Sequence, residues 1–408
     1  MSWSGRVACL PRVAVVGGSL TGLTAALVLR DLGCKVDVHE RSAAPLDGRG
    51  GGIVLHPVTV RYLRENALLD LRTVSTSATF HRYLAADGTV LDESVRRYRF
   101  TGYNALYGAL LRAFGRERYH LGHDVTGLAQ DADGVELAFS DGGTAQCDLV
   151  VAADGVSSFV RRTVLPGVRQ RYAGYVAWRG LVDERELEPG TAAALDDALT
   201  YHLGPGMHAL TYPIPNYDSD AEPGRRLMNL VWYRNVPAGR PLADLLTDRW
   251  GTRRDVSLPP GSVRDEQAAE LRATAAAVLP PPLAEVACRV AEPFLQVMVD
   301  VGVPRMAFGR VCLVGDAAFS VRPHAGAATA KGADDVWSLA AALTRCGGDV
   351  GAALRAWEPA QLQLGRALLE RTRELGDGVQ FRGDWVPGDP SLAFGLRRPG
   401  DSADMRDP

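Results

Sequence analysis

A glycine-rich segment near the start of the chain constrains its fold more than any other feature. GGSLTG, from Gly17 to Gly22, follows the apolar run Val13 to Val16 and opens an Ala- and Leu-rich segment from about Thr21 to Leu32. This order predicts a strand, a tight turn and a helix whose first N–H groups can face a pyrophosphate. We therefore expect an α/β chain with a Rossmann-like dinucleotide-binding domain.

Glu40 supports that expectation from further along the chain. It lies 23 residues after Gly17 and closes the predicted strand Lys35 to His39. A carboxylate there can accept hydrogen bonds from the ribose hydroxyls of a dinucleotide. Ser19 replaces the middle glycine of the G-x-G-x-x-G pattern, and such a pattern alone also occurs as a plain glycine turn in an ordinary α/β domain. The strand, helix and acidic residue around it favour the dinucleotide interpretation.

Two later motifs each follow a predicted strand. Leu149 to Ala153 leads into DGVSSFVR, which starts at Asp154, and Val311 to Val314 leads into GDAAFSVRPHAGAA, which contains Asp316. Asp316 can accept hydrogen bonds from ribityl hydroxyls. The turn before Ala327 to Ala330 opens a helix whose amides can face the N1–C2=O edge of an isoalloxazine ring. Together the three motifs predict that the dinucleotide is FAD.

Composition limits the other classes of function. With 408 residues, 46% of them apolar, the chain can bury a large core, and its net charge of −3 gives no electrostatic basis for binding nucleic acid or an anionic membrane. The six cysteines lack C-x-x-C spacing, which predicts buried free thiols rather than disulfides or a metal site. No apolar stretch has the length of a signal-peptide core or of a membrane span. We expect a cytoplasmic protein that acts on small molecules.

The predicted domains interleave along the chain. Alternating apolar runs such as Leu199 to Pro213 and Arg226 to Tyr233 predict an antiparallel sheet that crosses over the FAD-binding domain as a lid. Thr329 to Leu343 predicts a buried helix, and Ala352 to Leu375 a second one that is kinked or begins at Pro359. The expected boundaries are 1–72, 101–171 and 300–375 for the FAD-binding domain, 73–100 and 172–299 for the substrate domain, and 376–408 for a tail along the surface.

These motifs resemble a known family, the single-component FAD-dependent aromatic hydroxylases, of which para-hydroxybenzoate hydroxylase is the prototype. The segments VVGGSLTGLTAALVLRDLG, YAGYVAWRG, YPIP, RPHAGAATAK and WVPGDPSLAFGL are most similar to members that hydroxylate 2,6-dihydroxypyridine. Phe319 departs from the common GDAAH pattern, so the role of that family histidine does not carry over. The resemblance implies FAD contacts by Gly18, Ser19, Leu20, Glu40, Arg41, Arg112, Val125, Asp154, Asp316, Gly326, Ala327, Ala328, Thr329 and Ala330.

The resemblance also implies the reaction. NAD(P)H would reduce the flavin, O2 would form a C4a-hydroperoxide, and its distal oxygen would pass to a small electron-rich ring such as a hydroxypyridine or a phenol. Only one dinucleotide fingerprint is present, so NAD(P)H would bind transiently. The glycine run Gly48 to Gly52 around Arg49 is either a mobile element near the flavin or a plain surface turn. A homodimer is the assembly that we expect.

Other functions on the same scaffold stay open at this point. The same chemistry, as hydroxylation or epoxidation, could act on a larger secondary-metabolite substrate, and a flavin-binding protein without turnover would keep all three motifs. A flavin-dependent halogenase is disfavoured because its W-x-W-x-I-P signature is absent from the sequence.

Candidate catalytic residues are found on one loop and on the predicted lid. His324 is best placed, because its loop must approach the flavin ring, and His208 and Tyr212 lie on predicted lid strands that could line a cavity. Their expected role is to help ionise a ring hydroxyl. The competing interpretation is that the histidines are structural, with satisfied hydrogen bonds. Trp178 and Arg179 open the lid segment, where ordinary sheet packing is the simpler interpretation.

Overall fold

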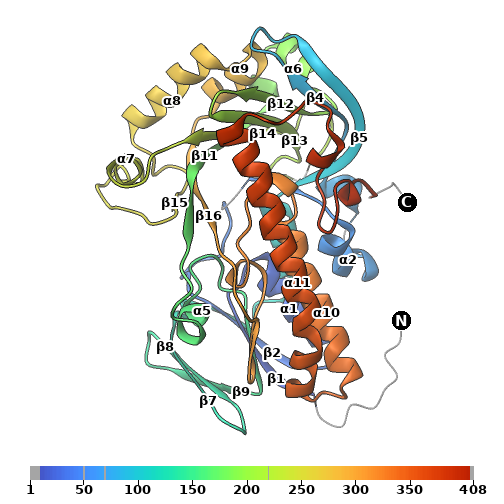
Figure 1. Cartoon of the computed structure of the whole chain (residues 1–408). Helices are drawn as coiled ribbons and strands as arrows, with labels where there is room; N and C mark the ends of the chain where they lie inside the picture. The colour runs from blue at the N-terminus through green and yellow to red at the C-terminus, as the bar shows by residue number, and fades with distance from the viewer. Residues whose placement is uncertain (1–9, 49–50, 69, 219, 405–408) are drawn as a thin grey trace.

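The computed structural model describes residues 10–48, 51–68, 70–218 and 220–404. The lower half of the molecule in Figure 1 holds a six-stranded sheet in the order β17-β18-β10-β1-β2-β6. Its strands pair in parallel except for β17 with β18. The central strands are made largely of buried Val, Ala and Leu, as a sheet covered on both faces requires. The bounds are β1 Arg12–Val16, β2 Lys35–Glu40, β6 Tyr119–Leu121, β10 Leu149–Ala152, β17 Ala307–Phe308 and β18 Val311–Leu313.

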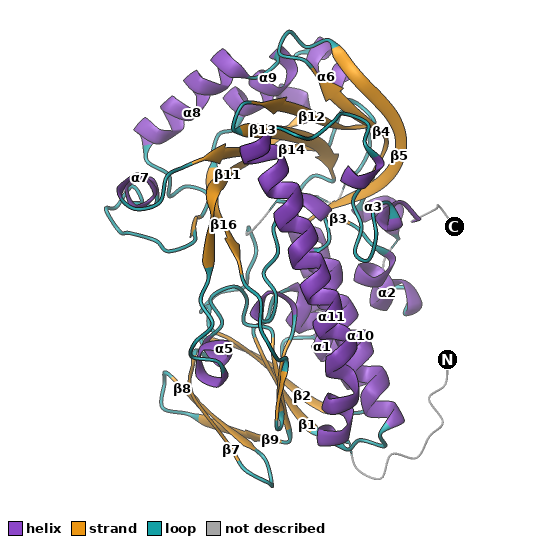
Figure 2. Cartoon of the chain, in the orientation of Figure 1, coloured by secondary structure: helices purple, strands orange, loops and turns teal. Residues whose placement is uncertain are grey.

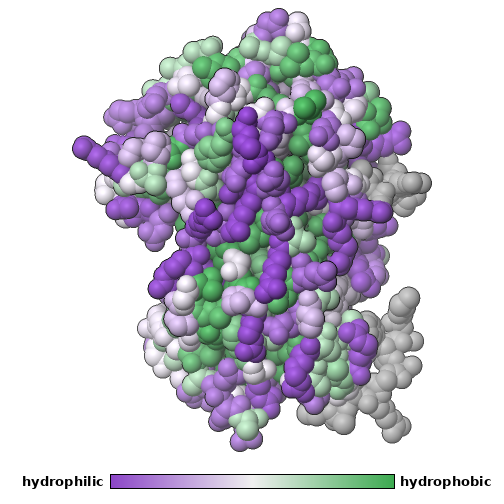
Figure 3. Space-filling view, viewed as in Figure 1, coloured by the Kyte–Doolittle hydropathy of each residue, from purple (hydrophilic) through white to green (hydrophobic). Residues whose placement is uncertain are grey.

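Four helices pack around this sheet. α1 (Leu20–Asp31) contacts α10 (Ala328–Arg345) and α4 (Tyr103–Phe114), and α10 contacts the long α11 (Val350–Asp377). α11 runs beside both halves of the molecule (Figure 2). One of its faces is buried, and its solvent face gives much of the hydrophilic band in Figure 3, with the exposed residues Arg355, Arg366, Glu370 and Glu374.

α11 passes through Pro359 without ending. The expectation that a helix begins at Pro359 is therefore wrong, because the helix starts at Val350. A proline removes one backbone hydrogen bond from a helix interior. Side chains on both sides of it tie α11 to α10: Trp357 Nε1 donates to Asp335 O (2.9 Å), and Gln361 Nε2 donates to Ser338 Oγ (2.9 Å). These tertiary bonds stabilise the helix through the proline.

The upper half holds a nine-stranded sheet in the order β15-β16-β11-β14-β13-β12-β4-β5-β3. It is antiparallel except where β12 pairs with β4 in parallel. The bounds are β3 Gly52–Val54, β4 Thr76–Leu84, β5 Val90–Gly102, β11 Arg171–Asp183, β12 Ala198–Gly204, β13 Met207–Ile214, β14 Leu227–Asn235, β15 Ser257–Leu258 and β16 Phe294–Asp300.

The two faces of this sheet differ because side chains alternate along each strand. Trp178 and Trp232 belong to the outer, largely aliphatic cluster, which is covered by α8 (Asp265–Val278) and α9 (Pro281–Arg289). The inner face is aromatic, with a cluster that includes Tyr83, Tyr98, Phe100, Tyr175, Tyr201, Tyr212 and Tyr233. The sheet therefore presents aromatic side chains toward the half of the molecule that holds the six-stranded sheet.

The remaining elements are short. β7 (Val125–Gln130), β8 (Val135–Phe139) and β9 (Thr144–Cys147) form a small sheet beside the first one, and the other helices are α2 Pro57–Glu65, α3 Leu71–Val74, α5 Phe159–Val164, α6 Pro189–Leu195 and α7 Arg240–Leu245. No helix within the described ranges is both long and apolar enough to cross a membrane.

The C-terminal segment turns back after α11, and its residues at positions 381–391 are exposed or half-buried. Three of its apolar side chains, Leu392, Phe394 and Leu396, which we expected to anchor the tail, are buried. Among the described cysteines, Cys34, Cys147 and Cys312 are buried free thiols, and Cys9 lies outside the described residues.

Candidate functional site

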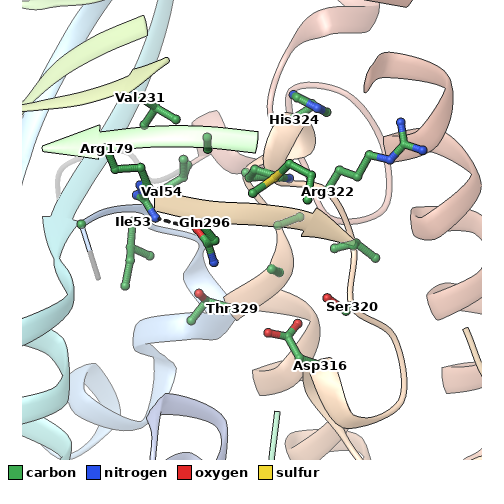
Figure 4. Close-up of a pocket in the computed structure, with 18 of the residues that line it drawn as sticks. Ile53, Val54, Arg179, Val231, Gln296, Asp316, Ser320, Arg322, His324 and Thr329 are labelled. Carbon is green, nitrogen blue, oxygen red and sulfur yellow. Dashed lines mark hydrogen bonds between the residues drawn. The ribbon is translucent and has the colours of Figure 1, made fainter. Parts of the chain in front are cut away.

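A cavity of about 500 Å³ lies between the two halves of the molecule. Its floor is formed by strand ends and loops of the half that holds the six-stranded sheet, and its roof by the aromatic face of the nine-stranded sheet. In Figure 4, Arg179, Ile53 and Gln296 lie at one end, His324 lies at the other, and Asp316 lies on the floor. The cavity therefore brings together residues from all parts of the chain.

The glycine-rich turn sits where β1 meets α1. Gly17 has a φ of +99°, which favours glycine, and a Cβ on Gly18 would lie 2.3 Å from Tyr119 Oη. Glu40 holds the turn: its carboxylate accepts hydrogen bonds from the N–H groups of Gly18 (2.9 Å) and Ser42 (2.9 Å). The predicted acidic residue is thus at the loop where a ribose would be recognised.

Ser19 and Leu20 line the cavity at the start of α1. Ser19 is the N-cap residue, and its hydroxyl hydrogen-bonds Tyr103 Oη (2.8 Å) rather than the helix backbone. The first N–H groups of α1 are therefore left without a side-chain cap, and such groups bind phosphate oxygens well. The serine that breaks the glycine pattern thus leaves the anion-binding end of the helix free.

The second motif is fixed by buried polar contacts. Asp154 Oδ2 accepts from Val160 N (3.1 Å), whereas Asp154 Oδ1 is buried and has no hydrogen-bond partner in the described part of the chain. Burial raises the pKa of Asp154. Arg161 is buried and donates to Ala317 O (2.9 Å), which joins this motif to the third one. The unpartnered oxygen of Asp154 marks a place for a ligand donor.

Asp316 presents its carboxylate to the cavity from a position deep in the molecule. The surrounding protein raises its pKa to about 6, and the nearby charges of Lys331 and Arg161 oppose that rise. A carboxylate that is open to the cavity but far from bulk water gains most from ligand hydroxyl donors. The geometry fits the expected contact with ribityl hydroxyls.

A buried ion pair supports the strand end that carries Asp316. Lys331 Nζ lies 2.8 and 2.6 Å from the two carboxylate oxygens of Asp335, and both side chains are almost fully buried. Asp335 Oδ2 also accepts from Gly315 N (2.8 Å). We did not predict this pair. The available signal was its i,i+4 spacing together with the rarity of lysine, since Lys331 and Lys35 are the chain's two lysines.

The third motif ends in the predicted helix start. Gly326 has a φ of +60°, and a Cβ there would lie 2.9 Å from both Phe394 and Val54. α10 begins at Ala328, and Lys331 N–H is bonded to Ala327 O (2.9 Å). Helix geometry leaves the preceding N–H groups, at positions 328–330, without intrahelical acceptors. These amides can face an electron-rich edge of a flavin ring.

The other predicted FAD contacts lie away from this cavity. Arg41 and Arg112 have exposed side chains, and Val125 is buried at the first position of β7. Arg49 lies outside the described residues. The roles of these four residues stay predictions.

The end of the cavity beneath the lid is a cluster of aromatic rings. His324 hydrogen-bonds Tyr175 Oη through Nε2 (2.7 Å), and the ring of His208 stacks on Tyr233 with 4.3 Å between centroids. His208 and His324 lie 5.2 Å apart, centroid to centroid. Tyr212 stacks on Phe100 and also lines the cavity. The three predicted catalytic residues therefore share one cavity.

Burial sets the protonation of these groups. It lowers the pKa of His324 to about 3 and that of His208 well below its usual value, while it raises the pKa of Tyr212 to about 12. At neutral pH the two histidines are uncharged and the tyrosine keeps its proton. They can exchange hydrogen bonds with a ring hydroxyl, but they bring no charge to it.

Neighbouring residues position the two histidines. Gln380 Nε2 lies within hydrogen-bond distance of His208 Nδ1 (3.4 Å), and His208 Nε2 is buried and has no partner among the residues described. The ring of Trp385 contacts both imidazoles, with 5.5 Å between its centroid and that of His208 and 6.1 Å between its centroid and that of His324. Gln380 and Trp385 come from the segment after α11, and no local pattern predicts that they contact the two histidines.

Comparison with known proteins agrees with this geometry. Residues 11–181 match the family described as FAD binding domain, and residues 172–300 match the family described as FAD binding domain-like. The chain is 39% identical over 386 residues to a 2,6-dihydroxypyridine 3-monooxygenase of Paenarthrobacter nicotinovorans, with 94% of this chain and 96% of the relative covered. This chain belongs to the FAD-dependent aromatic hydroxylases.

Other members of the family extend the comparison. The solved structure of 2,6-dihydroxypyridine-3-hydroxylase from Arthrobacter nicotinovorans superimposes with a TM-score of 0.91 at 38% identity, covering 96% of this chain and 98% of that one. A 3-amino-4-hydroxybenzoate 2-monooxygenase of Streptomyces cremeus is 30% identical over 386 residues, 90% of this chain and 87% of the relative. The predicted family, fold class and FAD cofactor are confirmed, and the protein is an FAD-dependent monooxygenase.

Proposed function

We propose that this monooxygenase hydroxylates a small electron-rich ring that already carries a hydroxyl group, a hydroxypyridine such as 2,6-dihydroxypyridine or a phenol, with NAD(P)H and O2 as co-substrates. The observation that carries the proposal is the aromatic end of the cavity, where His208, Tyr233 and His324 surround a space that opens directly onto the start of α10. The identity to the dihydroxypyridine enzyme supports the choice of ring.

Residues at the floor would hold the cofactor. Glu40 and the amides after Gly18 would bind the adenosine and pyrophosphate part, Asp154 and Asp316 the ribityl part, and the amides at positions 328–330 the flavin ring. When bound, FAD supplies the activation of O2 that no side chain can provide. The positive end of α10 would stabilise negative charge on the flavin.

Residues at the roof would bind and orient the substrate. A planar ring fits against the stacked aromatic side chains, and the neutral His208 and His324 would exchange hydrogen bonds with its hydroxyl groups. The nine-stranded sheet with α8 and α9 behind it excludes water from this end, which a reactive oxygen-transfer step needs. Because the same cavity of about 500 Å³ must also admit the flavin ring, it favours a small substrate over a large secondary metabolite.

We also propose that the protein is a homodimer and that it is cytoplasmic. Val90, Leu91 and Val95 lie along one part of β5 and are 55%, 62% and 65% exposed, which supports a homodimer through that strand. Buried free thiols support a reducing cytoplasm. Sedimentation of the wild-type chain and of Val95→Glu tests the dimer. We expect a dimeric wild type and a monomeric variant, and a monomeric wild type would reject the homodimer.

The experiment that tests the proposed function is a substrate screen with product analysis. The purified protein, loaded with FAD, is supplied with NAD(P)H and a panel of hydroxypyridines, phenols and larger bicyclic rings, and the products are weighed by mass spectrometry. We expect a small hydroxylated ring to gain one oxygen atom. Oxygen gain by the larger rings alone would reject the small-ring proposal, and failure of every ring to gain oxygen would reject the hydroxylase function.

A further inference from the structure

Arg179 lines the cavity but has no part in the cofactor and substrate contacts proposed above. Its half-buried side chain projects from β11 into the cavity, opposite His324 in Figure 4. Its hydrogen bonds are long, from Nη1 to Gln296 Oε1 (3.4 Å) and from Nη2 to Gly52 O (3.3 Å). Nε is buried without a hydrogen-bond partner, and no described carboxylate lies within ion-pair distance of the guanidinium. Arg179 therefore has unused donors.

The other charges of the cavity are accounted for. Arg322 is neutralised by Asp300, with 2.9 Å between Nη2 and Oδ2, and by Asp377, with 2.6 Å between Nη1 and Oδ1. Asp316 faces the floor, near Lys331. Of the described residues that line the cavity, Arg179 is the cation that no carboxylate balances.

The positive charge of Arg179 acts on the aromatic residues beneath the nine-stranded sheet. Its charge opposes the rise that burial causes in the pKa of Tyr212 and of Tyr233, and both tyrosines line the cavity. His208 and His324 are neutral there because burial lowers their pKa, and burial raises the pKa of Tyr201. Since Arg322 is paired with Asp300 and Asp377, an anionic ligand would find one unpaired positive group among the described residues of the cavity.

The surroundings of the guanidinium form a built site. A Cβ on Gly51 would lie 2.8 Å from Arg179 Nη2 and 2.6 Å from Asn229 Oδ1, so only glycine leaves room for both side chains. Asn229 Oδ1 accepts from Gly52 N (2.8 Å), which fixes the amide. Asn229 Nδ2 is buried and has no partner within the described residues, and it adds a donor beside the guanidinium. The absence of a side chain at Gly51 therefore leaves the space in which the Arg179 guanidinium and the Asn229 amide lie beside each other at the cavity wall.

We propose that Arg179, positioned by Gly51 and Asn229, is an oxyanion-binding residue of this cavity. The proposal rests on the proposed hydroxylase function for the identity of the ligand, but not for the existence of the site. Two ligands of that function carry a suitable oxyanion: the ionised ring hydroxyl of the aromatic substrate and the diphosphate of NAD(P)H. A guanidinium binds either through paired N–H donors, and next to an ionised ring hydroxyl it lowers the pKa of that hydroxyl.

The test uses 4-nitrophenol, whose neutral and ionised forms absorb at different wavelengths, bound to the FAD-loaded protein. The variants are Arg179→Met, Arg179→Lys, and the matched pair Gln296→Glu and Gln296→Leu, of which only the glutamate places a carboxylate beside Arg179. Arg240→Met is the charge control, because Arg240 is 92% exposed in its side chain and lies in α7. Titration gives the pKa of the bound phenol, and steady-state NAD(P)H oxidation gives the KM for the nucleotide.

If the substrate oxyanion is the ligand, bound 4-nitrophenol ionises at a lower pH than free 4-nitrophenol. Arg179→Met and Gln296→Glu then lose roughly tenfold of that preference, which is one pKa unit, whereas Arg179→Lys, Gln296→Leu and Arg240→Met keep most of it. If the nucleotide diphosphate is the ligand, the phenol titration is the same in all variants. The KM for NAD(P)H then rises in Arg179→Met and Gln296→Glu alone, and inorganic pyrophosphate competes with the nucleotide in the wild type and in the other variants but not in these two.

Wild-type values for both the phenol titration and the nucleotide KM in Arg179→Met would overturn the proposal. This outcome is distinct from failure of the hydroxylase function, because phenol binding is measured without turnover. A protein that binds 4-nitrophenol as its anion yet hydroxylates nothing would keep the oxyanion site and lose the proposed function.

Discussion

The floor and the roof of the cavity are built in different ways. At the floor, the residues that line the cavity lie in turns and helix starts that follow strand ends, such as Ser19, Gly155 and Asp316. At the roof, they are side chains from strands far apart in the sequence, such as Arg179 on β11 and His208 on β13. The floor can bind a cofactor shared by many enzymes, and the roof can change with the substrate while the fold stays the same.

This difference predicts that substitutions at the floor and substitutions at the roof have separable effects on FAD binding and on the reaction. Changes at the floor should remove FAD or destabilise the chain, whereas changes at the roof should leave FAD bound and alter the reaction. The variants below test that separation, and we expect their effects to decrease in the order given.

The largest effect is expected from Lys331→Met, which leaves Asp335 buried and unpaired beneath the strand end of Asp316. Breaking a buried ion pair in this way costs about 3–5 kcal/mol, so the free energy of unfolding in urea should fall by that amount. Lys35→Met is the matched control, because Lys35 is exposed. Wild-type stability of Lys331→Met would show that the pair does not support the floor.

Asp316→Ala should weaken FAD binding without unfolding the chain. Leaving the ribityl hydroxyls unpaired costs on the order of 1–3 kcal/mol, roughly five- to 150-fold in the dissociation constant. Glu40→Ala should also weaken FAD binding, because the variant loses the carboxylate that accepts from Gly18 N–H and holds the glycine-rich turn. Quenching of FAD fluorescence on binding measures the effect. Unchanged FAD affinity in both variants would remove the floor as the cofactor site.

The sequence predicted the floor better than the roof, and the reason is physical. Gly17 and Asp154 each follow a strand end, and Gly326 lies in the turn before a helix start; such local geometry is set by neighbours in the sequence. Arg179 and Asn229 meet only because β11 and β14 pair in one register, which no local pattern specifies. For the same reason Gln380 and Trp385 were missed, since they reach the roof only after α11 has crossed the whole molecule.

Local patterns also failed where tertiary contacts override them. Pro359 breaks a helix by its own chemistry, yet Trp357 and Gln361 bind α10 on either side of it and the helix continues. The Lys331–Asp335 pair was equally hidden, because an i,i+4 pair on a helix is usually exposed and here it is buried.

At the roof, His324→Asn should lower the hydroxylation rate by about tenfold to a hundredfold, which is at or below the lower end of the usual range for a residue that assists proton transfer. His208→Asn should do the same, because the two rings lie in one cluster. FAD affinity should stay at the wild-type value in both, and the pH profile of the rate should shift. A wild-type rate and pH profile in both variants would leave the histidines as packing residues only.

The smallest effect concerns stability in acid. Burial lowers the pKa of His324 to about 3 in the folded chain, whereas the pKa of an unfolded histidine is near 6.5. Protons therefore bind the unfolded chain first, and stability falls as the pH drops below 6.5. One such histidine costs about 1 kcal/mol at pH 5.5. Urea unfolding at pH 7.5 and 5.5 should show a smaller loss for His324→Asn than for the wild type, and an equal loss would contradict the lowered pKa.

The most direct test of the account is the source of the oxygen in the product. The FAD-loaded protein is given NAD(P)H, 2,6-dihydroxypyridine and ¹⁸O2, with simple phenols in parallel, and the products are analysed by mass spectrometry. The account predicts that one of these small rings gains a single ¹⁸O atom. Oxidation of NAD(P)H that yields only hydrogen peroxide with every ring tested would contradict it.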